Sequence, residues 1–159
     1  MKEKILSVLE TDGRISLNDL AFAVGEPVEK VSQAIMEMEA DNVICGYHAL
    51  INWDNLGQER ADAFIEVKVT PQRGVGFDDI AERIWQYPEV SSIYLISGSV
   101  DFVVFIEGKS MREVAMFVSE KLSTIDGVIS TTTQFILKKY KENGFVIVKQ
   151  KKDERVGIS

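Results

Sequence analysis

The sequence predicts an α+β fold with a small helical part and a larger part in which strands and helices alternate. Three observations predict it. Apolar residues recur at helical spacing in three short segments within residues 2–40. From Ala61 the pattern changes to strand-like runs separated by two helical patterns. The stretch 92–107 contains two apolar β-runs joined by a glycine turn.

The first forty residues predict three helices joined by tight turns. The first helix stops at residues 12–13, an Asp-Gly pair. The second opens at Ser16, which forms a capping-box pattern with Asp19, and ends at Gly25. The third has Pro27 in its first turn. The residues expected to point inward are Ile5, Leu6, Val8, Leu9, Leu17, Leu20, Ala21, Val24, Val28, Val31, Ile35 and Met38. This pattern predicts a winged-helix-like helix-turn-helix domain over residues 1–44.

The rest of the chain divides into three predicted segments. Residues 45–60 form a linking strand and a hinge, with a break at 54–57. Residues 61–141 read as strand, helix, strand, strand, helix, strand, with the last strand running from Val128 to Tyr140. That order predicts a ferredoxin-like βαββαβ domain with both helices on one face of the sheet. Residues 142–159 form a basic C-terminal extension, in which Lys149 to Arg155 are expected to be a frayed, solvated end.

The hairpin of residues 92–107 is apolar on both faces. Gly98 supplies the positive φ that its turn requires. One face carries Val100, Phe102, Val104 and Ile106, and the other carries Val103 and Phe105 together with Asp101 and Glu107. Helices cover only one face of such a sheet, so the other face is predicted to be buried against a second copy of the chain. Depending on register, that face carries Ile65 or Phe64, Val103, Phe105 and Ile136.

Composition excludes several classes of protein. The 159 residues are 45% hydrophobic and 27% charged, which is typical of a globular protein. No apolar run approaches the roughly 20 residues of a membrane-spanning helix. One cysteine, Cys45, permits no internal disulfide, and the first residues open directly into a helical pattern, so a cytoplasmic location is expected. The single histidine, His48, has no neighbouring ligand residues, so no metal or cofactor is expected.

The net charge of −7 is unevenly distributed. Residues 1–44 contain four basic and nine acidic side chains, whereas residues 138–159 contain seven basic and three acidic ones. The predicted helix-turn-helix domain therefore has more acidic than basic side chains, which opposes the neutralisation of DNA phosphates.

Six stretches follow one another in a characteristic order before a threonine-rich last strand, namely residues 5–14, 16–24, 42–47, 88–90, 97–101 and 122–128. Their order and spacing resemble the Lrp/AsnC (feast/famine) transcriptional regulators over about residues 1–141. The resemblance implies promoter DNA bound by the third helix, a dimer built from paired sheets that can assemble further into octamers, and an amino acid or similar effector bound between subunits.

Candidate site residues follow from that resemblance. The DNA contacts would come from Lys30, Ser32, Gln33 and Glu37. The effector contacts would come from Gly98, Ser99, Val100, Asp101, Thr131 and Thr133. The residues alone leave a second interpretation open: Asp101 can simply accept hydrogen bonds from nearby backbone, and the threonines can simply be good strand residues.

The third helix departs from the family pattern. Family members commonly carry arginines where this chain has Ala34, Met36 and Glu37, and a serine at the N-cap where it has Pro27. The outward face would show Glu29, Lys30, Gln33, Met36, Glu37 and Ala40. Gln33 suits adenine in the major groove, but few cations are present to neutralise phosphates. DNA binding is therefore expected to be weak or steeply salt-sensitive.

The sequence features bear on three possible functions. The leading hypothesis is a transcriptional regulator that couples an effector to promoter occupancy. The alternative is an effector-sensing oligomerisation module that has weakened or lost DNA binding and acts through a partner regulator. An enzyme similar in architecture, such as a tetrapyrrole decarboxylase, would need basic and histidine groups, and one histidine with a charge of −7 argues against it.

Overall fold

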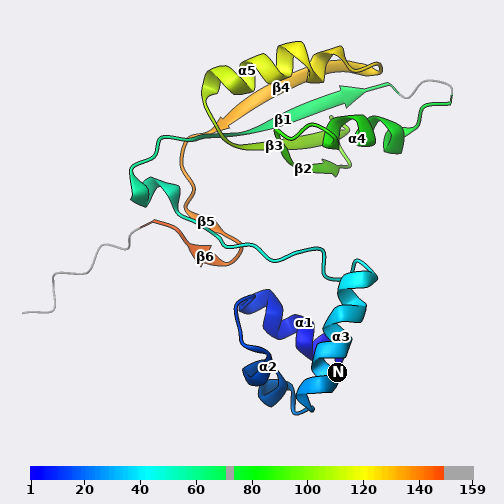
Figure 1. The fold of residues 1–159 in the computed structure, drawn as a ribbon. Coiled ribbons are helices and arrows are strands. Elements are labelled where there is room, and N and C mark those ends of the chain that lie inside the picture. Colours follow the sequence, from blue (N-terminus) through cyan, green and yellow to red (C-terminus); the bar gives the residue numbers. More distant parts are fainter. Residues whose placement is uncertain (71–73, 149–159) are drawn as a thin grey trace, which may run out of the picture. The chain divides into compact units, whose positions relative to one another are not determined.

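The computed structural model describes residues 1–70 and 74–148, and its two compact units divide between Ile51 and Asn52 (Figure 1). The division lies inside the segment that the sequence analysis assigned to a linking strand and hinge. Each unit has its own apolar core. The two units are therefore described separately.

The N-terminal unit contains helices α1 (Lys2–Thr11), α2 (Leu17–Val24) and α3 (Val28–Ala40). The predicted caps form: the Ser16 hydroxyl accepts the backbone N–H of Asp19 at 3.1 Å, and Gly25 ends α2 at φ 72°. Glycine adopts this left-handed conformation without the steric penalty that a Cβ brings. The predicted helices and their turns are thus confirmed.

The core of this unit differs from the prediction at two positions. Its buried residues are Ile5, Leu20, Ala21, Val24, Val31, Ala34 and Met38. Leu17, predicted to point inward, is 38% exposed because it is the first residue of α2 and lies beyond the contact with the other helices. Ala34 is 3% exposed, so it belongs to the core. Ala34 was not among the residues expected to point inward, and its small side chain offers DNA no contact.

The predicted linking strand does not form within the chain. Residues 45–52 are in neither a helix nor a strand, and Trp53–Leu56 is a short 3₁₀ helix that ends at Gly57. The Arg60 guanidinium lies 4.3 Å from the centre of the Trp53 ring and occupies the space where a Cβ on Gly108 would stand. Gly108 also has φ 72°, and this left-handed backbone conformation favours glycine there, whereas the Arg60 side chain could move aside for a Cβ.

The second unit contains β1 (Ala61–Val69), α4 (Phe77–Trp85), β2 (Val90–Leu95), β3 (Phe102–Lys109), α5 (Met111–Glu120) and β4 (Val128–Ile136). This is the predicted order. The four strands form an antiparallel sheet in the order β2-β3-β1-β4, visible in Figure 1. Both helices pack on one face, since Ile80 and Ile84 of α4 share a core with Val114 and Phe117 of α5. The ferredoxin-like fold is confirmed.

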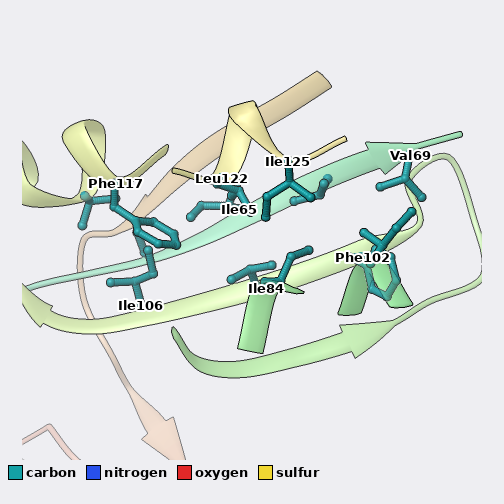
Figure 2. Packing of buried hydrophobic residues seen from close by; sticks show 13 residues of the cluster. Ile65, Val69, Ile84, Phe102, Ile106, Phe117, Leu122 and Ile125 are labelled. Atoms are coloured by element: carbon teal, nitrogen blue, oxygen red, sulfur yellow. The ribbon is translucent and has the colours of Figure 1, made fainter. Parts of the chain in front are cut away.

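The core lies between the sheet and these helices, as Figure 2 shows for eight labelled residues. Its strand members alternate along the chain, with Ile65 on β1 and Phe102, Val104 and Ile106 on β3. Ser110 starts α5 with a capping box: its hydroxyl accepts the Glu113 N–H at 3.1 Å. Phe102, Val104 and Ile106 therefore share one face of β3, as the alternation in the sequence predicts.

The register decides which residues occupy the opposite face. Phe64 pairs with Phe105, whereas Ile65 pairs with Val104 in the core. The Phe64 and Phe105 rings lie 6.0 Å apart, and Tyr94 of β2 makes an edge contact with Phe105 at 5.9 Å. Neither α4 nor α5 covers this aromatic face, where Tyr94 is 56% exposed.

The last predicted strand was too long. β4 ends at Ile136, and the chain then forms a small hairpin of β5 (Lys141–Glu142) and β6 (Phe145–Val146). Lys139 precedes this hairpin, and its Nζ contacts Asp62 of β1 at 2.9 Å, Glu142 at 3.3 Å and Glu107 of β3 at 3.5 Å. Partial burial by itself would lower the pKa of Lys139. The hydrogen bond and charge of Asp62, together with the charges of Glu142 and Glu107, outweigh this effect, so the pKa of Lys139 is raised. Part of the extension is therefore folded, and the predicted frayed end at 149–155 lies outside the described residues.

Candidate functional site

The turn between β2 and β3 is held to the neighbouring strand by Asp101. Its carboxylate Oδ2 accepts the backbone N–H of Val69 at 2.8 Å, and its own N–H donates to the Val67 carbonyl at 3.0 Å. Its carbonyl accepts the Ile96 N–H at 2.9 Å and closes the turn. Asp101 therefore has the backbone-anchoring role that the sequence analysis left open, on β1 rather than within its own turn.

The tip of this turn is exposed and has the predicted glycine geometry. Gly98 has φ 143°, and Gly98 and Ser99 are both solvent-exposed, while Val100 is half-buried. Exposed backbone N–H groups of a turn can receive a carboxylate, and Asp101, close to them in the chain, is half-buried. The turn thus places donors and an anionic acceptor within a few residues of one another.

Thr131 and Thr133 lie near the same end of the sheet but on a different strand. Their cross-strand partners are Val67 and Ile65, so both threonines share the helix-covered face and are half-buried. The Thr131 hydroxyl lies 3.4 Å from the hydroxyl of Ser123. Strand β1 separates them from the β2–β3 turn. One chain therefore does not bring the two groups of predicted effector residues into contact.

The outer surface of α3 presents the predicted polar residues in paired form. The Lys30 ammonium binds the Glu26 carboxylate at 2.8 Å, and the Gln33 amide donates to Glu37 at 3.2 Å. Lys2 of α1 binds the other Glu37 oxygen at 3.0 Å. The Lys30 hydrogen bond lowers the pKa of Glu26, and the Lys2 hydrogen bond and charge lower the pKa of Glu37. Both carboxylates therefore stay ionised on this surface at neutral pH.

The remaining members of that surface differ in access. Ser32 is half-buried, whereas Lys30, Gln33 and Glu37 are exposed and Met36 is 60% exposed. Apolar contact with a thymine methyl is the readout that Met36 could provide, beside a Gln33 amide that suits adenine. The surface has hydrogen-bonding and apolar groups but few unpaired cations.

Two ionic clusters escaped the sequence analysis. Lys139 gathers carboxylates from β1, β3 and β5, and Lys121 at the end of α5 binds Glu89 before β2. Apart from Lys139 and Glu142, which are three residues apart, the partners are distant in sequence, so no local spacing indicates them. The sequence gives one indication of a close contact in this region, at Gly108, because a glycine inside a strand often marks the close approach of another group.

Comparison with known proteins assigns the family. The family model of the Lrp/AsnC ligand binding domain matches residues 62–146, more than half of the chain. The chain belongs to the Lrp/AsnC family. It is 49% identical over 157 residues to the HTH-type transcriptional regulator YugG of Bacillus subtilis, covering 98% of this chain and 95% of that relative. The resemblance inferred from the order of sequence stretches is confirmed, and the protein is a transcriptional regulator.

Two solved structures extend this Lrp/AsnC comparison. A Neisseria meningitidis transcriptional regulator in complex with L-Met has 25% identity and a TM-score of 0.69, with 89% of this chain and 90% of that chain covered. The feast or famine regulatory protein from M. tuberculosis, complexed with L-methionine, has 26% identity and a TM-score of 0.70, with 92% and 97% covered. None of the helices in the described part of this regulator has the length and apolar composition that crossing a bilayer requires.

Proposed function

We propose that this regulator binds promoter DNA through the outer surface of α3 and changes that binding when an amino acid occupies the β2–β3 turn of an assembled oligomer. The observation that carries the effector part is that two solved relatives are complexes with methionine. The DNA part rests on the helix-turn-helix unit and on the likeness to HTH-type regulators. A protein that occupies promoters works where the DNA is, which supports the cytoplasmic expectation.

The charges of α3 predict a DNA affinity that depends steeply on salt and on assembly. Phosphate contacts supply much of DNA affinity, yet Lys30 is paired with Glu26 and Lys2 with Glu37. DNA binding must separate these pairs and bring ionised carboxylates close to phosphates. Several weak sites on one oligomer can still bind one promoter tightly, because linked sites act at a high effective concentration.

The single experiment that tests the proposed function is retention of genomic fragments by the purified protein, at low and physiological salt, with and without a panel of amino acids. Sequence-selective retention that changes with one amino acid supports it and names the effector. A dimeric or larger protein that retains no fragment at any salt contradicts DNA binding and leaves the partner-dependent module as the function.

Removing the α3 carboxylate charges should strengthen DNA binding. Glu37→Gln frees Lys2 from its ion pair and removes a negative charge from the surface that faces DNA. We expect the dissociation constant for a retained promoter fragment to fall by about tenfold at low salt, and by less at physiological salt. Fluorescence anisotropy with the labelled fragment measures both values.

Two matched variants control this experiment. Lys30→Gln removes a cation from the same surface and should weaken binding. Glu82→Gln removes one negative charge from the exposed surface of α4 and should leave the affinity unchanged. Equal strengthening by Glu37→Gln and Glu82→Gln would show that only net charge matters and that α3 is not the contact surface.

We propose that the Asp101 carboxylate binds the ammonium group of the effector. The backbone N–H groups of Gly98, Ser99 and Val100 would donate to the carboxylate of the effector. Thr131 and Thr133 lie on β4, two strands away from β3. They can contact the same effector molecule only if another subunit supplies them, or if the ligand extends across the end of the sheet. An arrangement shared between subunits would make effector binding sensitive to oligomeric state and so link it to DNA placement.

Asp101→Asn should separate the anchoring role of this residue from its ligand role. The amide oxygen of asparagine can still accept the Val69 N–H, so the turn should keep its conformation. The lost charge should weaken amino-acid binding by about 10- to 100-fold, since hydrogen bonds to charged groups are worth about 1.5–3 kcal/mol. Isothermal titration calorimetry measures the affinity, and thermal unfolding checks the turn. Unchanged affinity in a stably folded variant would remove Asp101 from the effector site.

A further inference from the structure

A cavity of about 200 Å³ lies beside α5, at the end of β3 that is opposite the β2–β3 turn. Its apolar lining comes from Ile106, Met116 and Phe117, and Figure 2 shows Phe117 directed from α5 toward Ile106. Its charged lining comes from Glu89, Lys109, Glu113, Glu120 and Lys121. Three carboxylates against two ammonium groups make the rim net acidic, which favours a cationic ligand over an anionic one.

The side chain of Lys121 binds at one end of this cavity. Its Nζ forms a hydrogen-bonded ion pair with Glu89 Oε1 and lies 5.6 Å from the centre of the Tyr87 ring. A carboxylate beside an aromatic face is a common arrangement for binding an ammonium group. Tyr87 is itself fixed by an edge contact with Phe117 at 5.6 Å. The Lys121 ammonium is thus held between the Glu89 carboxylate, which lines the cavity, and the Tyr87 ring, which lies next to it.

The occupancy by Lys121 is incomplete in two respects. Within the described part of the chain, Glu89 Oε2 is buried without a hydrogen-bond partner, a costly condition for a carboxylate oxygen. The Lys121 side chain is 41% exposed, whereas that of Glu89 is 22% exposed. The lysine can therefore swing into water at little cost, while the carboxylate stays where it is.

We propose that this cavity is a binding site for a small alkylammonium ligand, which displaces Lys121 from Glu89 and places its apolar chain on Ile106, Met116 and Phe117. The lysine side chain, a primary ammonium on a four-carbon stem, shows the shape that the site accepts. The ligand ammonium would bind Glu89 and face the Tyr87 ring, and its free donors could reach the unpaired carboxylate oxygen. This site is separate from the effector turn, because it lies at the other end of β3.

The test uses the full-length protein with methionine methyl groups labelled for NMR, because Met116 lines the cavity and Met36 lies on α3. Titration with butylammonium should shift the Met116 signal saturably and leave Met36 unchanged. Butyrate, which has the same chain length and the opposite charge, should shift neither. Putrescine, a diamine, and L-methionine, an amino acid, carry the same ammonium group as butylammonium. Titrating them as well shows which of these three classes of ligand the site binds.

Four variants decide between a ligand site and a structural ion pair. Lys121→Ala removes the internal competitor, so butylammonium should bind about fivefold tighter, which corresponds to about 1 kcal/mol of ion-pair free energy. Lys121→Gln keeps most of the side-chain stem and should also bind butylammonium tighter. It replaces the alanine variant in the experiment if that variant folds poorly. Glu89→Gln should abolish the Met116 shift, whereas Asp101→Asn should leave it intact. No saturable Met116 shift in the wild type and both Lys121 variants, or equal affinity in all of them, would overturn the proposal.

Discussion

Replacing Phe105 by arginine should yield monomers, because we propose that two copies of the chain pair through the aromatic face. Phe105 lies at the centre of the aromatic face, with Phe64 at 6.0 Å on one side and Tyr94 at 5.9 Å on the other. In a two-fold dimer built from this face, each copy would bury an arginine without an anionic partner. An unpaired buried charge costs about 3–5 kcal/mol, enough to raise a dimer dissociation constant by about two to four powers of ten. Sedimentation velocity measures the change.

Glu82→Arg is the matched control for this prediction. It introduces the same side chain on the exposed surface of α4 and should leave the assembly intact. The Phe105 side chain is only half-buried within the single chain, so Phe105→Arg should keep the sheet folded, which circular dichroism can verify. A Phe105→Arg protein that remains the size of the wild type would show that the aromatic face is not the interface.

Truncating Phe102 should have the largest effect on stability. This residue is 1% exposed, begins β3 beside Asp101, and makes an edge contact with Phe77 of α4 at 6.0 Å. Phe102→Ala removes a ring from a packed core and leaves a cavity, which typically costs about 3–5 kcal/mol. Folded domains have total stabilities of about 5–15 kcal/mol, so much of the stability of the sheet unit should disappear. Urea unfolding monitored by circular dichroism measures the loss.

The chain offers a direct comparison for this truncation. Phe22 on α2 is 91% exposed, so Phe22→Ala makes the same chemical change without creating a cavity. We expect its effect on the free energy of unfolding to stay within about 0.5 kcal/mol. Similar losses in both variants would mean that Phe102 is not packed as the structure shows. Because Phe102 follows Asp101, Phe102→Ala should also weaken effector binding at the adjacent turn.

Much of the fold could be predicted because its signals are local. The capping residue Ser16 and the glycines Gly25 and Gly98 each act on a few neighbouring residues, and all three have the predicted roles. Alternation along β3 likewise predicted which of its side chains enter the core. The predictions failed where distant contacts decide. The linking strand at 45–52 has no strand partner in its own chain, and β4 stops at Ile136 where the chain leaves the sheet.

The candidate site shows the same division. The sequence by itself determined the order of elements, the family, the glycine turn with its carboxylate and the acidic character of α3, because these depend on residue type and spacing. Only the tertiary structure decided that Phe64 rather than Ile65 lies on the aromatic face, since a one-residue slip in register exchanges the two faces of a strand. It also decided that Asp101 anchors to Val69 and that Lys121 binds Glu89, each across 32 residues of chain. Such contacts arise from packing between elements, and no local pattern specifies them.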